Sequence, residues 1–520
     1  MKKLTIIEPI ANPAAENESS AATLERKGSY GSINNDLEGK NSATESSSMS
    51  LKVPELEKTL TLFHTVSIAV GQIIGSGIFI SPNVIIKGVG SMGLSLIIWT
   101  VGGLLSLCGA LCFGELGAIC PKAGGEYQYI KMTYGRMASF ANLWNLIIVN
   151  SMAVAVISLT FSTYFLSLFM DPSHSHFETL KKVLAAFAIL TVVSICMYGT
   201  KAGVWVQNVF TITKFLALLF LVSLAVAYLC QGHTENITSG FEGSNMDVSK
   251  WSGALLTSLW AYNGWNHISI VASEVKNPEK NVPRALVISM VLVTCTYIVI
   301  NLAYHTLLSP YDLIRSESIA VHAGEMFFAE YSQGTLTFAR YFFATSVAVS
   351  TFGALLSITL SSSRLPYAGA VEGMMPTLFG LVSKTNKTPI TSLAFLGSCA
   401  FLCVWPSNIG NLIQYVGFLS WIFWGLCFVA VIVLRFKMPD IQRPFKIPLV
   451  VPVLAALTSL YLIVGSVYAN PLISGLWLIA ALLSVPVYYG YVDNEKMCQR
   501  WMDKLTNILL HYLEAAEQKQ

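Results

Sequence analysis

Long apolar runs alternate with short polar segments along most of the chain, beginning near Leu62. Most runs approach the roughly 20 residues that an α-helix needs to cross the hydrocarbon core of a bilayer. Within each run the apolar residues are continuous and do not alternate with polar ones, which excludes transmembrane β-strands. The pattern therefore predicts an all-α membrane protein with twelve spans, over residues 62–86, 93–119, 138–170, 183–198, 204–230, 253–275, 285–308, 338–361, 390–404, 411–434, 449–468 and 472–491.

The two ends of the chain differ in composition from this apolar region. Residues 1–57 are rich in Ser, Asn, Glu and Ala, and they hold no apolar run of the roughly 7 residues that a signal peptide needs. Such a segment is typical of a disordered tail. We expect an N-terminal tail over 1–57, a membrane domain over 58–492 and a C-terminal tail over 493–520.

The basic residues of the loops predict the orientation. Lys and Arg are more numerous in the loops on one side, and by the positive-inside rule that side is cytoplasmic. With an even number of spans, both termini then lie in the cytoplasm. The same topology places the sequon Asn236-Ile237-Thr238 outside, where glycosylation of Asn236 is expected.

Composition excludes several classes of protein. Of the 520 residues 54% are hydrophobic and only 12% are charged, too few for the surface of a water-soluble protein of this length. The net charge of +3 gives no basic face for nucleic acid. The cysteines form no zinc or disulfide framework, and no His–Asp cluster or carboxylate pair shares one depth. We therefore expect no enzyme, no metal and no cofactor.

The first span contains small polar residues at its middle, in the segment from Gly71 to Phe79. Gly75, Ser76 and Gly77 weaken a helix at bilayer depth and leave backbone groups in need of partners. One interpretation is an unwound turn whose N–H groups bind a carboxylate at the start of the next half-helix. The alternative is close helix packing, which small residues also favour.

The sixth span is interrupted at a similar depth, from Trp260 to His267. Five helices separate the two interruptions, as expected if helices 1–5 and 6–10 form a 5+5 inverted repeat whose first helices both unwind around one substrate. Carbonyls freed by the second break accept an ammonium group, while the first break holds a carboxylate. The pair of breaks thus predicts a site for a zwitterionic amino acid.

Lys214 lies inside the fifth apolar run, where an unpaired ammonium costs roughly 2.5–3.5 kcal/mol. It must face protein or water. We interpret it as a fixed positive charge that takes the place of a coupling cation; snorkelling to the interface is the alternative.

At these residues the chain resembles the light-chain (L-type) family of heteromeric amino-acid transporters, in the amino acid-polyamine-organocation superfamily. The resemblance covers residues 56–491 and is carried by four motifs in order: Gly71 to Pro82, Pro121 to Tyr127, Trp260 to Asn266, and Glu274 to Arg284. It implies a twelve-helix transporter with repeats over 58–230 and 252–434 and two further helices over 447–492. It also implies sodium-independent exchange of amino acids across the plasma membrane.

The family pattern further implies roles for single residues. Ser76 and Gly77 would bind the substrate carboxylate, with Gly75 beside them, and the backbone oxygens of Ile73 and Trp260 would take the ammonium. The ring of Trp260 would act as a gate, and Lys214 matches the family's fifth-helix lysine.

Asn263, next to Gly264 in the predicted substrate-binding set, stands where relatives that accept dibasic amino acids have an acidic residue. Because an amide cannot neutralise a cationic side chain, we expect a preference for neutral amino acids.

One departure from the family concerns its partner. Family members form a disulfide with a single-span glycoprotein through a cysteine after the third helix, but residues 163–182 contain no cysteine. No disulfide-linked heavy chain is expected, and a non-covalent partner stays open.

Two other functions remain in competition at this point. One is a proton-coupled symporter on the same fold. The other is an amino-acid sensor or scaffold with little transport, which would signal through the Ser-rich tail.

Overall fold

The computed structural model describes residues 58, 60–122, 124–170, 174–270, 272–316, 318–329, 331–382, 388–405, 409–469 and 471–492. Both predicted tails lie outside these residues. Within the described part, all regular elements are helices, and the single β-type pairing is an isolated parallel bridge between Leu60 and Val275. The predicted all-α class is confirmed.

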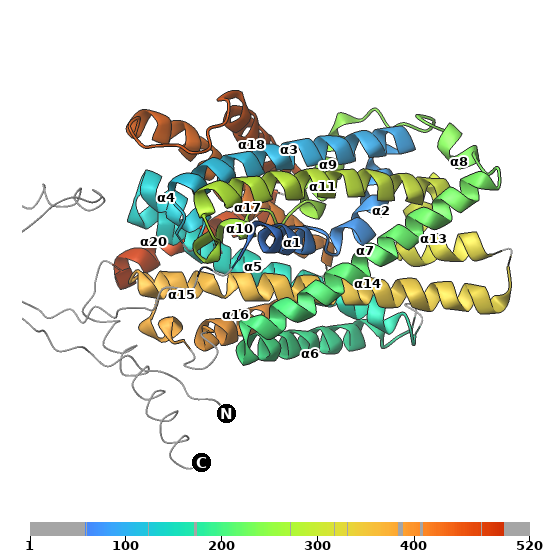
Figure 1. Cartoon of the computed structure of the whole chain (residues 1–520), viewed down its shortest axis with the longest axis horizontal. Helices are drawn as coiled ribbons and strands as arrows, with labels where there is room; N and C mark the ends of the chain where they lie inside the picture. The colour runs from blue at the N-terminus through green and yellow to red at the C-terminus, as the bar shows by residue number, and fades with distance from the viewer. Residues whose placement is uncertain are drawn as a thin grey trace, which may run out of the picture. The chain divides into compact units, whose positions relative to one another are not determined.

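The helices follow one another in the order drawn in Figure 1. They are α1 (Leu62–Ile73), α2 (Gly77–Val89), α3 (Met92–Ile119), α4 (Glu126–Tyr134), α5 (Arg136–Leu166), α6 (Phe177–Tyr198), α7 (Thr200–Cys230), α8 (Glu235–Thr238), α9 (Val248–Ala261), α10 (His267–Ile270), the 3-10 turn η1 (Ala272–Glu274), α11 (Pro278–Leu307), α12 (Pro310–Arg315), α13 (Ile319–Phe328), α14 (Gln333–Ser362), α15 (Arg364–Val371), the 3-10 turn η2 (Thr377–Gly380), α16 (Ile390–Val404), α17 (Ile409–Lys437), α18 (Val450–Ala469), α19 (Pro471–Leu482), α20 (Ser484–Val487) and the π-helical turn η3 (Tyr488–Val492).

Nine helical segments among the described residues are long and apolar enough to cross a membrane, and the bent pair α1–α2 makes a tenth. The protein is therefore a multi-pass membrane protein. The predicted sixth and ninth spans correspond to α9, with 14 residues, and α16, with 15. Neither alone reaches membrane length, so the count of twelve stays a prediction.

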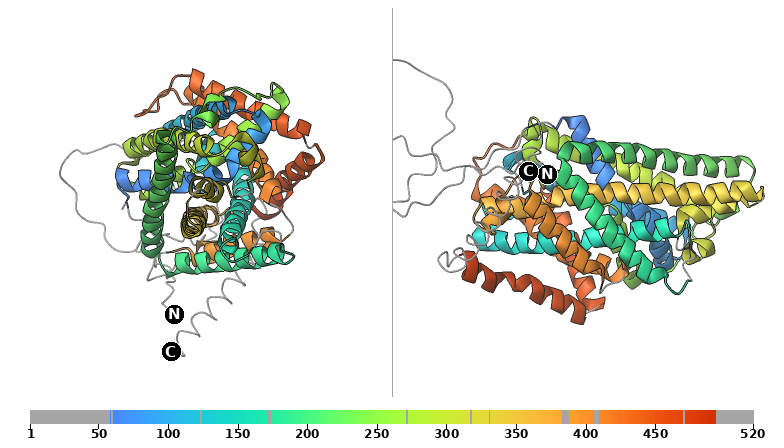
Figure 2. Two further views of the ribbon diagram at one scale, coloured as in Figure 1. Left: turned by 90° about the vertical axis from the view of Figure 1, so that its right-hand side faces the viewer. Right: turned by 90° about the horizontal axis from the view of Figure 1, so that it is seen from below.

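Two helices occupy the interior of the bundle. In α5 and in the α14–α15 segment, 78% of the most apolar 18-residue stretch is buried inside the protein. The same fraction is 22% in α18 and 11% in the segment that contains α19. In Figure 2, α5 and α14 lie near the centre of the helix bundle, and in Figure 1, α18 lies at its edge. The exposed apolar side chains of the outer helices need lipid as their solvent.

Close packing in the bundle depends on small residues. α3 packs along α11 and also against α9. A Cβ atom at Gly102 would lie 2.1 Å from Ser258 Oγ, and one at Gly103 would lie 2.6 Å from Thr294 Cγ2. Glycine at both positions lets the helix backbones approach, as in other membrane helix pairs.

A buried ion pair joins the end of α3 to the end of α17. The Glu115 carboxylate is 1% exposed and accepts hydrogen bonds from Arg435 Nε at 3.0 Å and from the backbone N–H of Ile447 at 2.9 Å. Arg443 Nε lies 3.7 Å from the same carboxylate. Glu115 is thus a structural anion held by two arginines, and it takes no part in the central site.

Candidate functional site

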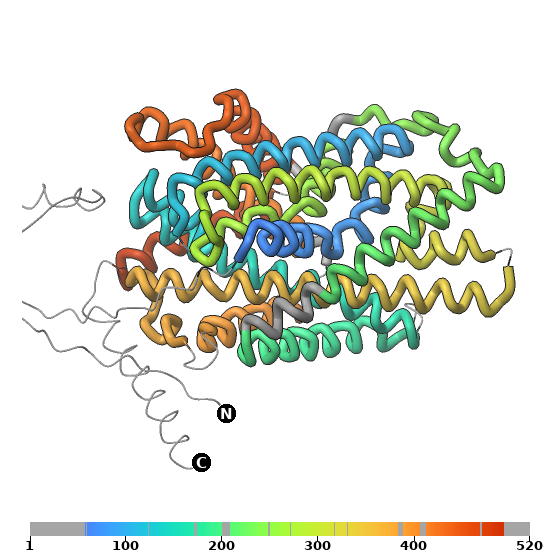
Figure 3. Tube along the Cα trace, viewed as in Figure 1, coloured from blue at the N-terminus to red at the C-terminus, as the bar shows by residue number. Residues whose placement is uncertain are grey.

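The first span breaks where the sequence predicts. α1 ends at Ile73, α2 begins at Gly77, and the two segments are bent by 45°, as the Cα trace in Figure 3 shows. The N–H groups of Gly77 and Ile78 open α2 and have no acceptor within that helix. The break therefore exposes carbonyls at the end of α1 and N–H donors at the start of α2, at the middle of the span.

The second break follows α9. That helix ends at Ala261, residues 262–266 form turns, and α10 begins at His267. Gly264 has a φ of +129°, a backbone conformation that residues other than glycine rarely adopt. A Cβ atom at this position would lie 3.2 Å from the backbone nitrogen of Ile73. The turn of the second break thus packs directly on the end of α1.

Gly77 makes the matching contact from the first break. A Cβ atom at this position would lie 2.5 Å from the Cα atom and 2.8 Å from the Cβ atom of Ala261. At Gly75 the nearest atom would be at 3.4 Å, an ordinary contact. Close approach of the two breaks therefore requires glycine at 77 but not at 75.

Tyr297, on α11, bridges the two breaks. Its hydroxyl oxygen lies 2.9 Å from the carbonyl oxygen of Ile73 and 3.0 Å from that of Ala261. One hydroxyl proton serves one of these acceptors at a time. In the sequence Tyr297 is marked only as a tyrosine inside an apolar run, which needs a partner when buried.

Lys214, on α7, reaches the same helix end from the other side. Its ammonium is 1% exposed and donates to the carbonyl oxygen of Gly71 at 2.9 Å and to that of Ile74. A cation at the carbonyl end of a helix is stabilised by the helix dipole. The expectation that Lys214 faces protein is confirmed, and snorkelling is excluded.

Polar side chains next to the breaks are also bonded to one another. Ser361 Oγ on α14 lies 3.1 Å from His267 Nδ1 and 3.4 Å from Gln72 Nε2. These contacts tie α1, α10 and α14 together. His267 is accordingly a hydrogen-bonded residue of the interior.

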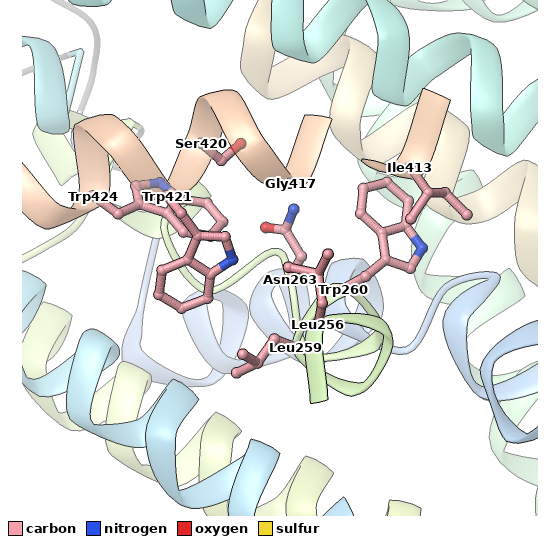
Figure 4. A pocket seen from close by; sticks show the side chains of 9 residues that line it. All are labelled: Leu256, Leu259, Trp260, Asn263, Ile413, Gly417, Ser420, Trp421 and Trp424. Atoms are coloured by element: carbon pink, nitrogen blue, oxygen red, sulfur yellow. The ribbon is translucent and has the colours of Figure 1, made fainter. Parts of the chain in front are cut away.

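Trp260 and Asn263 line a space of about 280 Å³, its mouth included, between α9 and α17. Figure 4 shows the Asn263 amide pointing towards α17, with the Trp260 indole on one side and the indoles of Trp421 and Trp424 on the other. The backbone oxygen of Trp260 accepts the N–H of Asn263 at 3.0 Å and has a second lone pair free for another donor. Of the predicted substrate-binding residues, these two face a space.

The remaining predicted site residues lie where the two breaks touch each other. Ser76 is 4% exposed, Gly77 rests on Ala261, and Gly264 rests on Ile73. None of Ile73, Gly75, Ser76, Gly77 and Gly264 lines the space beside Trp260. These five residues therefore lie where the two breaks contact each other, while Trp260 and Asn263 line the neighbouring space.

Asn236 lies in the short helix α8, where its Nδ2 donates to the carbonyl oxygen of Thr306 at 3.2 Å. It is half-buried. Because a glycan would replace one of two amide hydrogens, this bond is compatible with the predicted modification.

Membrane-length helices around two helix breaks that touch each other are typical of a class of protein, the secondary membrane transporters. A family model described as amino acid permease matches residues 60–487. The chain belongs to this family, and within it to the light-chain group of heteromeric amino-acid transporters.

Three relatives illustrate the group. The chain is 35% identical to the b(0,+)-type amino acid transporter 1 of Mus musculus over 468 residues, which covers 90% of this chain and 94% of the relative. It is 34% identical to the human cystine/glutamate transporter, covering 89% and 92%. It is 37% identical to the human large neutral amino acids transporter small subunit 2, covering 85% and 82%. The resemblance found in the sequence is confirmed, and the chain is a transporter.

The contact between Gly77 and Ala261 makes a testable prediction. Gly77→Ala forces the two breaks apart, and overpacking of this kind costs roughly 1–3 kcal/mol. We expect the initial rate of amino-acid uptake, normalised to the amount of protein in the membrane, to fall about tenfold, since 1.4 kcal/mol corresponds to that factor. Gly253→Ala on α9 is the control, because nothing lies within 4 Å of a Cβ there. Equal uptake by the two variants would contradict this account of the breaks.

Proposed function

We propose that this chain is a sodium-independent exchanger of amino acids in the plasma membrane and that it prefers neutral substrates. The observation that carries the proposal is the junction of two broken helices, in which Tyr297 and Lys214 occupy main-chain carbonyls at the end of α1. A free amino acid carries an ammonium group, which donates to main-chain carbonyls of this kind, and a carboxylate, which accepts from N–H groups such as those at the start of α2.

The substrate would bind between the breaks by its two charged ends. Its carboxylate would accept from Ser76 and Gly77 at the start of α2, where the helix dipole also favours negative charge. Its ammonium would donate to the carbonyl oxygens of Ile73 and Trp260. The Trp260 ring, beside the space that Asn263 faces, would then close over the side chain.

Sodium independence rests on Lys214. Sodium in a transporter needs a cage of carbonyl oxygens such as those at the end of a broken helix. In this chain the Lys214 ammonium already lies against the carbonyls of Gly71 and Ile74. A second cation beside it would be repelled, so the resident charge takes the place of the ion.

The preference for neutral substrates rests on Asn263. Its uncharged amide faces the space between α9 and α17, and no Asp, Glu, Lys or Arg is among the described residues that line that space. A cationic side chain entering there would lose hydration without gaining a counter-charge, which is costly. The names of the relatives do not decide the matter, because they include a cystine/glutamate transporter and a large neutral amino acids transporter.

Assembly and orientation complete the proposal. Residues 163–182 hold no cysteine. A heavy-chain partner, as expected for a light chain of a heteromeric transporter, would therefore bind without a disulfide. Both termini would lie in the cytoplasm, and the twelve spans would comprise the 5+5 repeat and two further helices.

Exchange and its independence of sodium are tested with purified protein in liposomes. We expect efflux of a radiolabelled neutral amino acid to require an amino acid on the opposite side, at the same rate in sodium and in choline buffer. Efflux into empty buffer driven by a pH gradient would instead support proton symport. Binding without any flux would support a sensor.

The selectivity is tested by competition for uptake. In the native protein leucine should inhibit uptake more strongly than arginine. Asn263→Asp places a carboxylate beside the substrate side chain, and because a charged hydrogen bond contributes about 1.5–3 kcal/mol, arginine should gain at least tenfold in potency. Asn263→Ser keeps the position uncharged and should give no such gain. Stronger inhibition by arginine than by leucine in the native protein would refute the neutral preference.

A further inference from the structure

A second space lies beside the turn of the second break, where Asn263, Asn266 and His267 line it. It is bounded by residues of α4, α5, the turn before α10, α14 and α17, and it amounts to about 370 Å³ with its mouth included. Asn263, Ser420 and Trp424 line both this space and the one in Figure 4, so the two adjoin. A side chain that passes Asn263 would enter here.

Four residues that line this second space carry hydrogen-bond acceptors without donors. Four buried oxygens have no hydrogen-bond partner: Glu126 Oε2, Asn145 Oδ1, Asn263 Oδ1 and Asn266 Oδ1. Glu126 and Asn145 are each 1% exposed, and Asn266 is 5% exposed. A buried acceptor left unpaired costs roughly 1–3 kcal/mol, so these oxygens favour any occupant that carries N–H groups.

The side-chain amide of Asn266 is oriented by its neighbour Glu126. Asn266 Nδ2 donates to Glu126 Oε1 at 3.2 Å, and a flipped amide would place two oxygens against each other. The Oδ1 atom of Asn266 therefore remains turned away from Glu126 and free. Asn150, which also lines the space, is already satisfied, because its amide donates to Leu146 and accepts from Ser362.

Charge does not determine what this space binds. Neither Lys nor Arg is among the described lining residues, and Glu126 is their single carboxyl group. Burial raises the pKa of Glu126 to about 7, although the hydrogen bond from Asn266 acts to lower it. At neutral pH this carboxyl therefore carries a full negative charge for only part of the time, and its protonated form offers an O–H donor beside a carbonyl acceptor.

The other lining residues are largely apolar. They include Leu146, Val149, Ile358, Val416 and Phe423. An occupant thus needs an aliphatic stem on one side and N–H donors at its end. Among neutral amino acids, a side chain that ends in a carboxamide meets both requirements, because its amide nitrogen carries two donors. Its carbonyl oxygen would find a donor in the Ser420 hydroxyl.

We propose that Glu126, Asn145 and Asn266, together with Asn263, form a specificity subsite for the side-chain carboxamide of the substrate, so that glutamine and asparagine are favoured over aliphatic amino acids. The proposal rests on the proposed function, since the main-chain ends of the substrate must lie at the two breaks. An aliphatic side chain in the same place would leave the four acceptors desolvated and unpaired.

The test compares ligands that differ in their donors. Purified full-length protein in liposomes is assayed by counterflow with radiolabelled alanine, and the competitors are glutamine, the γ-methyl ester of glutamate, leucine and arginine. The ester keeps the stem and the carbonyl group of glutamine but has no N–H. If two hydrogen bonds of about 1 kcal/mol each are gained, glutamine should compete at least tenfold more strongly than the ester and than leucine.

A variant locates the effect. Asn145→Leu removes one acceptor and keeps the number of side-chain heavy atoms, and it should reduce the advantage of glutamine over the ester about fivefold while leaving leucine unchanged or improved. Asn142→Leu is the matched control, because Asn142 lies on the same helix and is also buried without a hydrogen-bond partner, but it does not line the space. It should leave the ratio unchanged.

The outcomes separate the subsite from the proposed function. Equal competition by glutamine and its ester in the native protein would overturn the subsite and show that water alone fills the space. Equal ratios in Asn145→Leu and Asn142→Leu would overturn the assignment of Asn145. Strong competition by arginine above all others would overturn the neutral preference, and absence of counterflow with every amino acid would overturn exchange; neither result depends on the ratio of glutamine to ester.

Discussion

Main-chain polar groups that lose their helical partners inside a membrane must find others, and this requirement shapes the centre of the protein. The end of α1 leaves carbonyl groups unpaired, and three of them accept from side chains of distant helices: Gly71 and Ile74 from Lys214, and Ile73 from Tyr297. Because an unsatisfied group in hydrocarbon costs several kcal/mol, a broken span is stable only with such supports. Lys214 and Tyr297 supply these supports here.

Glycine determines how closely the two breaks approach. Gly77 lies against Ala261, and Gly264 lies against Ile73 with a positive φ. Tyr297 then spans both breaks with one hydroxyl group that serves two acceptors in turn. The carbonyl oxygen of Ile73 also accepts the N–H of Gly75 at 2.8 Å. The arrangement of the two broken helices therefore depends on a few main-chain oxygen atoms.

Much of this could be predicted from the sequence, and the limits have physical causes. Continuous apolar runs predicted the membrane helices, and glycine or polar residues in mid-span predicted both breaks, because these signals are local. The partners of Lys214 and the role of Tyr297 could not be predicted, since they depend on contacts between residues more than 100 positions apart. In the sequence Glu126 is marked only as part of a family motif. Its burial beside Asn266 could not be predicted, because it depends on the contact between the start of α4 and the second break. The short α9 also shows that apolar length alone overestimates the helical part of a span, whereas α16 has the bounds that the sequence predicts.

The central claim is that main-chain groups of the two breaks bind both charged ends of one amino acid. The most direct test is equilibrium binding to the purified protein of leucine, of leucinamide, which lacks the carboxylate, and of N-acetyl-leucine, which lacks the ammonium. Each charged end makes hydrogen bonds of roughly 1.5–3 kcal/mol, so each analogue should bind about 100-fold more weakly than leucine. Binding of either analogue within about threefold of leucine would contradict the claim.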